Sequence, residues 1–272
     1  MAEAKRLLIL GGTGEAAALA HRLGRLPNLG IVTSMAGRTR APAAVPGELR
    51  VGGFGGAEGL ARYLTERPID LVIDATHPYA ARMTANAAAA CAEVGVPRLL
   101  LSRPPWQEQP NDRWVRAPDA AAAARMLPEL GRRVFLSTGR QDLAPYAGLG
   151  ELWFLVRLIE EPDEPLPLAN YELILGRGPF AAEDEAALLQ AHGIAVVLSK
   201  NSGGQATYGK IEAARRLGLP VVMIARPPLP QGEMVHTVDE AAAWAEAQCN
   251  AEPSHSETGA SGVDAGASNN DL

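Results

Sequence analysis

The sequence has few of the residues that mark secreted, metal-bound or membrane-embedded proteins. Its 272 residues include only 2 cysteines, Cys91 and Cys249, too few for a disulfide framework or a cysteine zinc cluster. No apolar stretch approaches the roughly 18 residues of a membrane-spanning helix. The N-terminus lacks the long apolar segment and cleavage site of a secretory signal. We therefore expect a cytoplasmic protein with no metal site and no membrane partner.

The chain has little net charge of either sign, and most of its net negative charge is at one end. The net charge is −6, and residues 251–272 supply four carboxylates and no Lys or Arg, which leaves −2 for the rest of the chain. A nearly neutral body argues against nucleic-acid binding. Because residues 251–272 are rich in Ser, Gly, Ala and Asn, we expect them to be disordered. Anionic ligands would have to bind at local clusters of Arg and Lys.

The remaining chain alternates short apolar runs with helical segments, which is typical of a parallel α/β sheet. Expected strands are 6–10, 31–34, 71–74, 98–102, 134–137, 152–158, 171–175, 195–199 and 221–224. Expected helices are 15–26, 57–66, 80–94, 119–130, 183–191, 206–217 and 239–248. Prolines and a polar segment interrupt the pattern near residues 104–112. We therefore predict two Rossmann-like lobes with mostly parallel sheets and an interlobe cleft, at 1–110 and 111–250.

A glycine-rich turn joins the first expected strand to the first helix. Residues 11–17 read GGTGEAA, which contains the G-x-G-x-x-A pattern of dinucleotide-binding turns. Such glycines allow a tight turn and the close approach of a pyrophosphate to a helix N-terminus. The alternative is a plain tight turn with no ligand. The predicted cofactor contacts here are Gly11, Gly12, Thr13, Gly14 and Glu15.

The end of the second expected strand favours NADPH over NADH. An NAD site usually has an Asp or Glu about 20 residues beyond the glycine turn, bonded to the ribose 2′-hydroxyl. Here the strand ends at Ser34 and continues to Arg38 and Arg40, with no acid before Glu48. A charged contact from either arginine to a 2′-phosphate would be worth roughly 1.5–3 kcal/mol. The alternative is that both arginines are solvated surface charges.

Two more polar clusters follow expected strands. In the segment 74–80, DATHPYA, Asp74 is placed to orient Thr76 or His77, although a hydrogen-bonded structural histidine is the alternative. Segment 199–204, SKNSGG, places Lys200 among small polar residues, a setting that suits a carboxylate or a conjugated nitrogen, unless it is a solvated loop lysine. The later pair Tyr208 and Lys210 lacks the Tyr-x-x-x-Lys spacing of short-chain dehydrogenases.

Taken together, LGGTGE, DATHPYA and SKNSGG followed by TYGK resemble the precorrin-6A reductases of cobalamin biosynthesis, over roughly residues 6–248. The resemblance implies NADPH bound mainly by the first lobe, with Thr76 in its site, and a tetrapyrrole in the interlobe cleft. It also implies reduction of one carbon–carbon double bond of precorrin-6A to give precorrin-6B. Whether the substrate is metal-free or cobalt-bound stays open.

A tetrapyrrole with acetate and propionate arms implies cationic and hydroxyl contacts at the strand ends. The expected substrate-binding residues are Tyr79, Arg103, Ser137, Thr138, Gly139, Arg140, Arg177, Lys200, Asn201, Ser202 and Lys210. A proton must reach the carbon next to the one that accepts hydride. Lys200, Tyr208 and His77 are the candidate catalytic residues for that step, and the sequence does not rank them.

Two other functions compete with this interpretation. Another NADPH-dependent reductase or epimerase is disfavoured by the missing Tyr-x-x-x-Lys and by the second lobe. A dinucleotide-sensing regulator would bind NADPH without oxidising it, and its second lobe would bind a protein. The sequence leaves the oligomeric state open, and we take a monomer as the working expectation.

Overall fold

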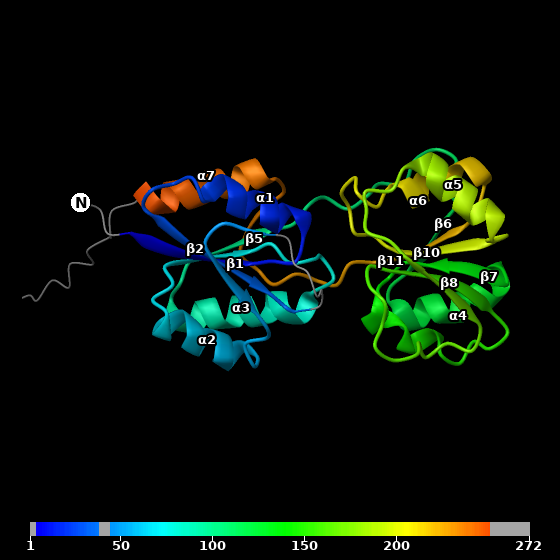
Figure 1. Ribbon diagram of the computed structural model, residues 1–272, viewed down its shortest axis with the longest axis horizontal. Coiled ribbons are helices and arrows are strands. Elements are labelled where there is room, and N and C mark those ends of the chain that lie inside the picture. Colours follow the sequence, from blue (N-terminus) through cyan, green and yellow to red (C-terminus); the bar gives the residue numbers. More distant parts are fainter. Residues whose placement is uncertain (1–3, 38–43, 251–272) are drawn as a thin grey trace, which may run out of the picture.

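A computed structural model describes residues 4–37 and 44–250, which form two lobes side by side (Figure 1). Arg38 and Arg40, and the expected disordered segment 251–272, lie outside the described residues. Each lobe has a sheet of six strands, and every strand pair is parallel. The α/β class is therefore confirmed. Across the described ranges, no helix is long and apolar enough to cross a membrane.

The first sheet is covered by helices on both faces. Its strand order is β12 (Glu233–Val235), β5 (Arg98–Leu101), β4 (Leu71–Asp74), β1 (Lys5–Leu10), β2 (Leu29–Met35) and β3 (Glu48–Val51). Helices α1 (Gly14–Leu23) and α7 (Val238–Asn250) cover one face, and α2 (Ala57–Glu66) and α3 (Ala81–Val94) cover the other (Figure 1). Side chains alternate between faces along a strand, so Leu7 and Ile9 pack on the α1 side and Leu8 and Leu10 on the opposite side.

The second sheet repeats this architecture. Its order is β6 (Trp114–Ala117), β11 (Val221–Ile224), β10 (Val196–Lys200), β7 (Arg133–Leu136), β8 (Trp153–Leu158) and β9 (Tyr171–Leu175). Helix α4 (Ala120–Leu130) and two short 3-10 helices, Arg140–Asp142 and Ala144–Tyr146, lie on one face. Helices α5 (Ala182–Ala191) and α6 (Gly209–Leu217) lie on the other. Buried strands with apolar side chains on both faces are expected for a parallel sheet between two helical layers.

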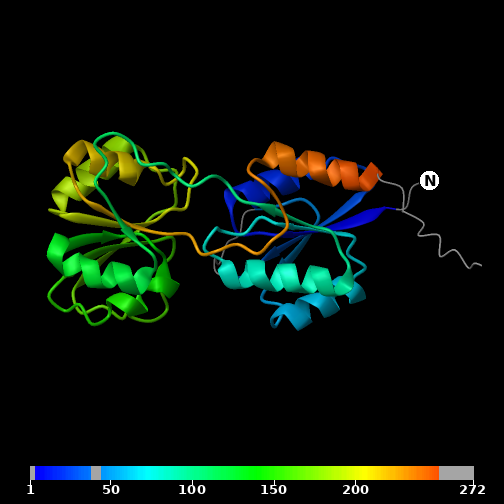
Figure 2. The ribbon, with the colours of Figure 1, turned by 180° about the vertical axis from the view of Figure 1, so that it is seen from behind.

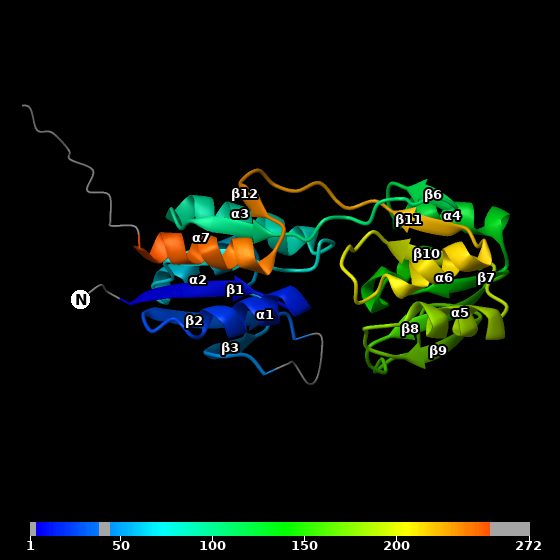
Figure 3. The ribbon, with the colours of Figure 1, turned by 90° about the horizontal axis from the view of Figure 1, so that it is seen from above.

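The chain crosses between the lobes twice, and each crossing delivers an edge strand to the other sheet (Figure 3). After β5 the chain leaves the first sheet and forms β6 in the second, beside β11. After β11 it returns to form β12 beside β5, and α7 then packs against α1 (Figure 2). The prediction that residues 111–250 form the second lobe is therefore wrong for residues 233–250. It assumed that each lobe is one continuous segment.

Three strands in the structure are absent from the sequence-based expectation: β3, β6 and β12. All three are edge strands of three or four residues with mixed or exposed side chains, so none shows the apolar run that identified the central strands. All the expected strands and helices are present, with ends that coincide or differ by at most three residues.

Candidate functional site

The carboxyl edges of the two sheets face each other. Tyr79 follows β4, and its hydroxyl accepts a hydrogen bond from the backbone N–H of Asn201, just past β10, at 2.7 Å. The same hydroxyl donates to the carbonyl of Ile224, the last residue of β11, at 2.5 Å. Ligands of open α/β sheets bind outside the carboxyl ends of strands. The two lobes therefore bring these two edges together at one interlobe junction, where Tyr79 meets Asn201 and Ile224.

The glycine turn between β1 and α1 is held firmly and is open on its outer side. The Gly11 N–H donates to the carbonyl of Ser34 at 2.8 Å. Thr13 caps α1 by accepting from the Ala16 N–H at 3.1 Å, and its hydroxyl donates to the carbonyl of Ala75 at 2.8 Å. Gly12 has a φ of +109°, a conformation that favours glycine. Among residues 4–37 and 44–250, no atom lies within 4 Å of where a Cβ would stand on Gly12 or Gly14, so these residues leave the helix N-terminus open to a ligand.

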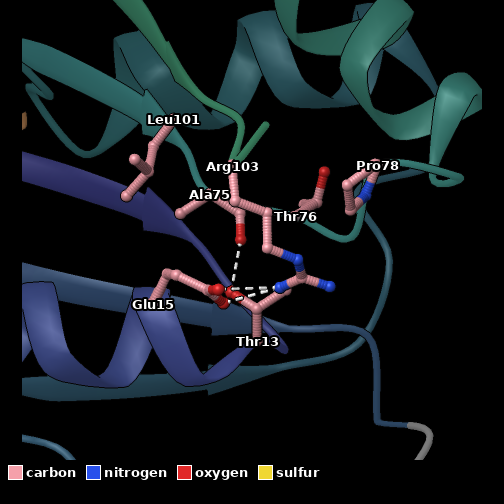
Figure 4. Close-up of a pocket in the computed structure, with 7 residues that line it drawn as sticks. All are labelled: Thr13, Glu15, Ala75, Thr76, Pro78, Leu101 and Arg103. Atoms are coloured by element: carbon pink, nitrogen blue, oxygen red, sulfur yellow. Dashed lines mark hydrogen bonds and ion pairs between the residues drawn. The ribbon is translucent and has the colours of Figure 1, made fainter. Parts of the chain in front are cut away.

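A pocket lies beside this turn, between β1 and β4 (Figure 4). Its lining residues are Thr13, Glu15, Ala75, Thr76, Pro78, Leu101 and Arg103. Its enclosed space is about 10 Å³, room for about one water molecule, so it is a shallow depression beside the turn and not a preformed ligand pocket. In the first lobe this is the point where the strand order reverses, the usual ligand position in doubly wound sheets.

Arg103 connects the pocket to the second lobe. Its Nη1 donates to both carboxylate oxygens of Glu15, at 2.9 and 2.8 Å, and its Nε donates to the carbonyl of Ser202 at 2.8 Å. Glu15 lies in the first turn of α1, where an anionic ligand would meet its negative charge. The guanidinium of Arg103 offsets that charge.

Asp74 orders the loop that forms the pocket floor. The carboxylate is fully buried, and its Oδ1 accepts from the backbone N–H of Thr76 at 3.1 Å and from the Thr76 hydroxyl at 2.7 Å. Its Oδ2 has no hydrogen-bond partner among residues 4–37 and 44–250. Asp74 thus orients Thr76, one of the two roles that the sequence suggested.

His77 is a neutral imidazole in a cationic environment. Burial, together with the smaller effect of the positive charges of Arg103, Lys200, Arg226 and Lys210, lowers its pKa to about 3. Its Nδ1 accepts from the backbone N–H of Tyr79 at 3.3 Å, which leaves the ring proton on Nε2. At neutral pH His77 is therefore a hydrogen-bond donor through Nε2 and carries no second, acidic proton.

Lys200 ends β10 at the cleft. Its ammonium forms an ion pair with Asp142 from the 3-10 helix after β7, and it lies 5.1 Å from the centre of the Tyr79 ring. The Lys200 side chain is 16% exposed, so a ligand can reach it. A lysine held between a carboxylate and an aromatic face has a fixed direction.

Two buried hydroxyls lie at the same edge without partners. Ser137 and Thr138 follow β7, and neither side-chain oxygen has a hydrogen-bond partner within the described part of the chain. Gly139 then turns the chain with a φ of +95°. Unpaired buried hydroxyls are uncommon and costly, which makes these two suitable contacts for a polar ligand. Arg140 and Arg177 are more than half exposed and lie near Asp163 and Glu160, respectively, so they form an outer rim.

Asn201 and Ser202, which the sequence placed among the substrate contacts, hold the crossing segment. The Asn201 side chain accepts from the backbone N–H of Trp106 at 2.7 Å and donates to the Trp106 carbonyl at 3.1 Å. The carbonyl of Ser202 accepts from Arg103 and from Arg226. Their polar groups are therefore engaged in the junction between the lobes.

Tyr208 and Lys210 lie away from the pocket. The Tyr208 hydroxyl accepts from Arg215 Nη2 at 2.6 Å, and its ring packs against Trp106 with 5.6 Å between ring centres. Lys210 is only 6% exposed, and its ammonium donates to the carbonyl of Thr207 at 2.9 Å. Burial lowers the pKa of Lys210 to about 8. Both residues pack at the start of α6.

Two residues at the cleft were missed by the sequence interpretation. Arg226 donates to the carbonyls of Asn201, Arg103 and Ser202, which ties together the two crossing segments. Its position just past β11 is the same signal that singled out the other cations at strand ends. Asp142, the partner of Lys200, lies in a 3-10 helix and gives no such signal.

Comparison with known proteins gives one consistent result. A family model described as "Precorrin-6x reductase CbiJ/CobK" matches residues 6–246. Curated proteins named precorrin-6A reductase are 51% identical in Rhodococcus erythropolis, over 88% of this chain and 96% of that protein, and 45% identical in Rhodobacter capsulatus, over 88% and 95%. A cobalt-precorrin-6A reductase from Salmonella typhimurium is 33% identical over 84% and 90%. The solved structure of a CobK precorrin-6A reductase is 44% identical, with a TM-score of 0.84 over 90% of this chain and 97% of that one.

Proposed function

The chain belongs to the precorrin-6x reductase family, an enzyme family of cobalamin biosynthesis, and on that premise we propose that NADPH is its hydride donor. The enzyme reduces a carbon–carbon double bond of a tetrapyrrole. We place the cofactor on the first lobe and the tetrapyrrole against the second. The main support for this placement is the open glycine turn, whose outer side would admit a pyrophosphate at the N-terminus of α1.

The residues of the first lobe fit a dinucleotide. Open space at Gly12 and Gly14 lets phosphate oxygens reach the backbone amides of α1, while Thr13 holds the turn to β4 through Ala75. NADPH, when bound, supplies the hydride. We assign Thr76, fixed by Asp74, to positioning the nicotinamide end, because the pocket at the switch point lies beside it.

The residues of the second lobe fit an anionic macrocycle. Lys200, with the unpaired hydroxyls of Ser137 and Thr138, is assigned to binding the carboxylate arms of the substrate. His77 contributes a neutral N–H from the opposite edge. Burial keeps His77 neutral, and the nearby cations, which lower its pKa further, also create the positive potential that a polycarboxylate requires.

Of the three candidate proton donors, the geometry favours Lys200. The neutral His77 ring has no acidic proton to give at neutral pH. The Tyr208 hydroxyl is bonded to Arg215 on the α5 and α6 side of the sheet. The Lys200 ammonium lies at the carboxyl edge of the second sheet, between Asp142 and the Tyr79 ring, and its side chain remains accessible to a ligand.

The names of the relatives favour a metal-free substrate. The relatives that share 45–51% identity are named for precorrin-6A, and the Salmonella relative at 33% is named for the cobalt form. We therefore propose that this enzyme acts on metal-free precorrin-6A.

The test is NADPH oxidation by the purified protein with precorrin-6A, with its cobalt complex, and with neither. We expect oxidation with the metal-free substrate, a lower kcat/KM with the cobalt complex, and none without a tetrapyrrole. NADPH binding without oxidation under all three conditions would support the sensor alternative. Faster turnover with NADH than with NADPH would contradict the cofactor assignment.

A further inference from the structure

Arg50 lies on β3, at the carboxyl edge of the first sheet, and β2 separates β3 from β1, the strand that leads into the glycine turn. It is the cross-strand neighbour of Ser34, and its Nη1 donates to the Ser34 hydroxyl at 3.3 Å. The carbonyl of Ser34 in turn accepts from the Gly11 N–H. Ser34 occupies the position, 20 residues beyond Gly14, where NAD-dependent enzymes place a carboxylate for the ribose. Arg50 therefore lies where the ribose 2′ position of a dinucleotide on this turn is expected.

The guanidinium of Arg50 is locked in one orientation. Nη1 donates to the carbonyl of Gly52 at 2.6 Å, and Nη2 donates to the carbonyl of Gly53 at 2.8 Å. The guanidinium carbon lies 3.7 Å from the centre of the Phe54 ring, and Tyr63 packs edge-on against Phe54 with 5.1 Å between ring centres. A cation held flat on an aromatic face is pre-organised for a planar, two-pronged contact.

Arg50 retains the capacity to bind an anion. Its side chain forms no ion pair with a carboxylate in residues 4–37 and 44–250. The three hydrogen bonds to Ser34, Gly52 and Gly53 use three of the five N–H groups that a guanidinium carries. The residue is half-buried, so a ligand can reach it.

The glycine-rich loop after Arg50 leaves the space above it open. Residues 52–56 read GGFGG, and Gly52, Gly55 and Gly56 have φ values of +117°, +84° and +97°. No atom of the described part of the chain lies within 4 Å of the Cβ position at any of the four glycines. A loop without side chains on this side lets a large ligand lie against its backbone.

We propose that Arg50 is a specificity-determining residue that binds the 2′-phosphate of NADPH together with Ser34. The inference rests on the proposed function, in which the first lobe binds NADPH. A guanidinium binds a phosphate through charge-assisted hydrogen bonds, whereas the 2′-hydroxyl of NADH offers it no charge. Arg50 therefore contributes to the affinity for NADPH and adds little to the affinity for NADH.

Binding measurements on ligand fragments test this without turnover. Adenosine 2′,5′-bisphosphate and adenosine 5′-monophosphate are titrated by calorimetry into wild type, Arg50→Ala and Arg50→Lys, and NADPH and NADH are titrated in parallel. Loss of one charged contact predicts that Arg50→Ala raises the Kd of the bisphosphate and of NADPH about tenfold or more. The Kd of the monophosphate and of NADH should change less than about threefold, and Arg50→Lys should lie between wild type and Arg50→Ala. Arg62→Ala removes the same charge from an exposed position on α2 and should match wild type.

Ser34→Asp gives an independent test that keeps Arg50 in place. A carboxylate beside Arg50 should pair with its guanidinium, repel a 2′-phosphate and accept a ribose hydroxyl, so the preference should shift toward NADH. The inference would be overturned if Arg50→Ala weakened the binding of the bisphosphate and the monophosphate equally, or weakened neither. It would also be overturned if Ser34→Asp left the preference for NADPH over NADH unchanged. If wild type binds neither dinucleotide, the proposed function fails. If wild type prefers the 2′-phosphate and Arg50→Ala keeps that preference, only the role of Arg50 fails.

Discussion

The two lobes share one architecture, but their carboxyl edges differ in how charge is used. At the first edge the ligand-facing groups are a glycine turn, a threonine and an open loop, and the pair between Glu15 and Arg103 is partly exposed, at 31% and 18%. In the second lobe the pair between Lys200 and Asp142 is exposed to a similar extent, at 16% and 38%, but another ion pair lies deeper. The side chains of Arg157 and Glu185 are only 10% and 3% exposed.

Under the proposed function, the two edges bind different ligands. A dinucleotide pyrophosphate can be bound by backbone amides, which need space more than charge. A polycarboxylate macrocycle needs cations, and buried cations are costly unless they are paired. The second lobe has such pairs: Glu185 binds the Arg157 guanidinium through two hydrogen bonds, at 2.9 and 2.6 Å, and Asp142 binds Lys200.

The largest expected effect tests how deeply the charges of the second lobe are buried. Glu185→Gln should lower the free energy of unfolding by about 3–5 kcal/mol, because it leaves the Arg157 guanidinium buried without its counter-charge. Glu15→Gln should cost about 1 kcal/mol or less, since that pair is closer to solvent. Urea unfolding of both variants measures the difference. If both variants lost a similar free energy of unfolding, the two ion pairs would not differ in how deeply they are buried.

A second effect separates the inner cation at the cleft from the rim. Lys200→Ala should lower kcat/KM by about 10- to 100-fold through loss of one charged contact, with the Kd of NADPH unchanged. If kcat falls as much as kcat/KM, the lysine acts in the transition state; if only KM rises, it anchors the substrate. Arg140→Ala is the matched control at the exposed rim and should change kcat/KM less than about threefold. Wild-type kinetics in Lys200→Ala would exclude the lysine from substrate binding.

Much of the fold could be predicted because the central strands are apolar on both faces. The edge strands β3, β6 and β12 could not, because their short mixed sequences carry no periodic signal. The exchange of edge strands was also hidden. Val235 and Val238 are ordinary apolar residues, and nothing local shows that they pack on the first lobe.

The site shows the same limit at the level of single side chains. The sequence placed Lys200 and Asn201 together at a strand end, and the structure does the same. The Asn201 side chain, however, is hydrogen-bonded to the backbone of Trp106. Lys210 is a polar residue near the same strand end, yet it begins a helix whose inner face is buried. Arg50 was not singled out because it lies on an edge strand that the sequence did not reveal. Proximity to a strand end is readable from sequence, whereas side-chain direction is not.

A third effect tests whether burial and the nearby cations keep His77 neutral. The pKa of His77 is lowered to about 3 in the folded protein, so the unfolded chain, with a value near 6.5, binds a proton first as the pH falls. Stability is therefore complete above pH 6.5 and declines toward pH 3. Between pH 7 and pH 5 the wild type should lose about 2 kcal/mol more than His77→Gln. Urea unfolding at the two pH values measures this, and parallel losses would show that the ring titrates normally.

The smallest expected effect tests whether NADPH binds in the open space at the glycine turn of the first lobe. Gly12→Ala forces a side chain onto a φ of +109°, at a cost of about 1–3 kcal/mol, and should weaken NADPH binding about tenfold. Gly14→Ala has no such strain and replaces the glycine with a better helix former, so it should leave the fold as stable as wild type or more so.

Its methyl group would nevertheless stand in the open space before α1, so Gly14→Ala should still raise the Kd of NADPH several-fold. Gly148→Ala, a glycine on the second lobe with equally open surroundings, is the control and should bind NADPH like wild type. If Gly14→Ala also binds like wild type, the turn is only a backbone turn. The cofactor would then have to be recognised by side chains, as at the second edge, and the contrast between the two lobes would disappear.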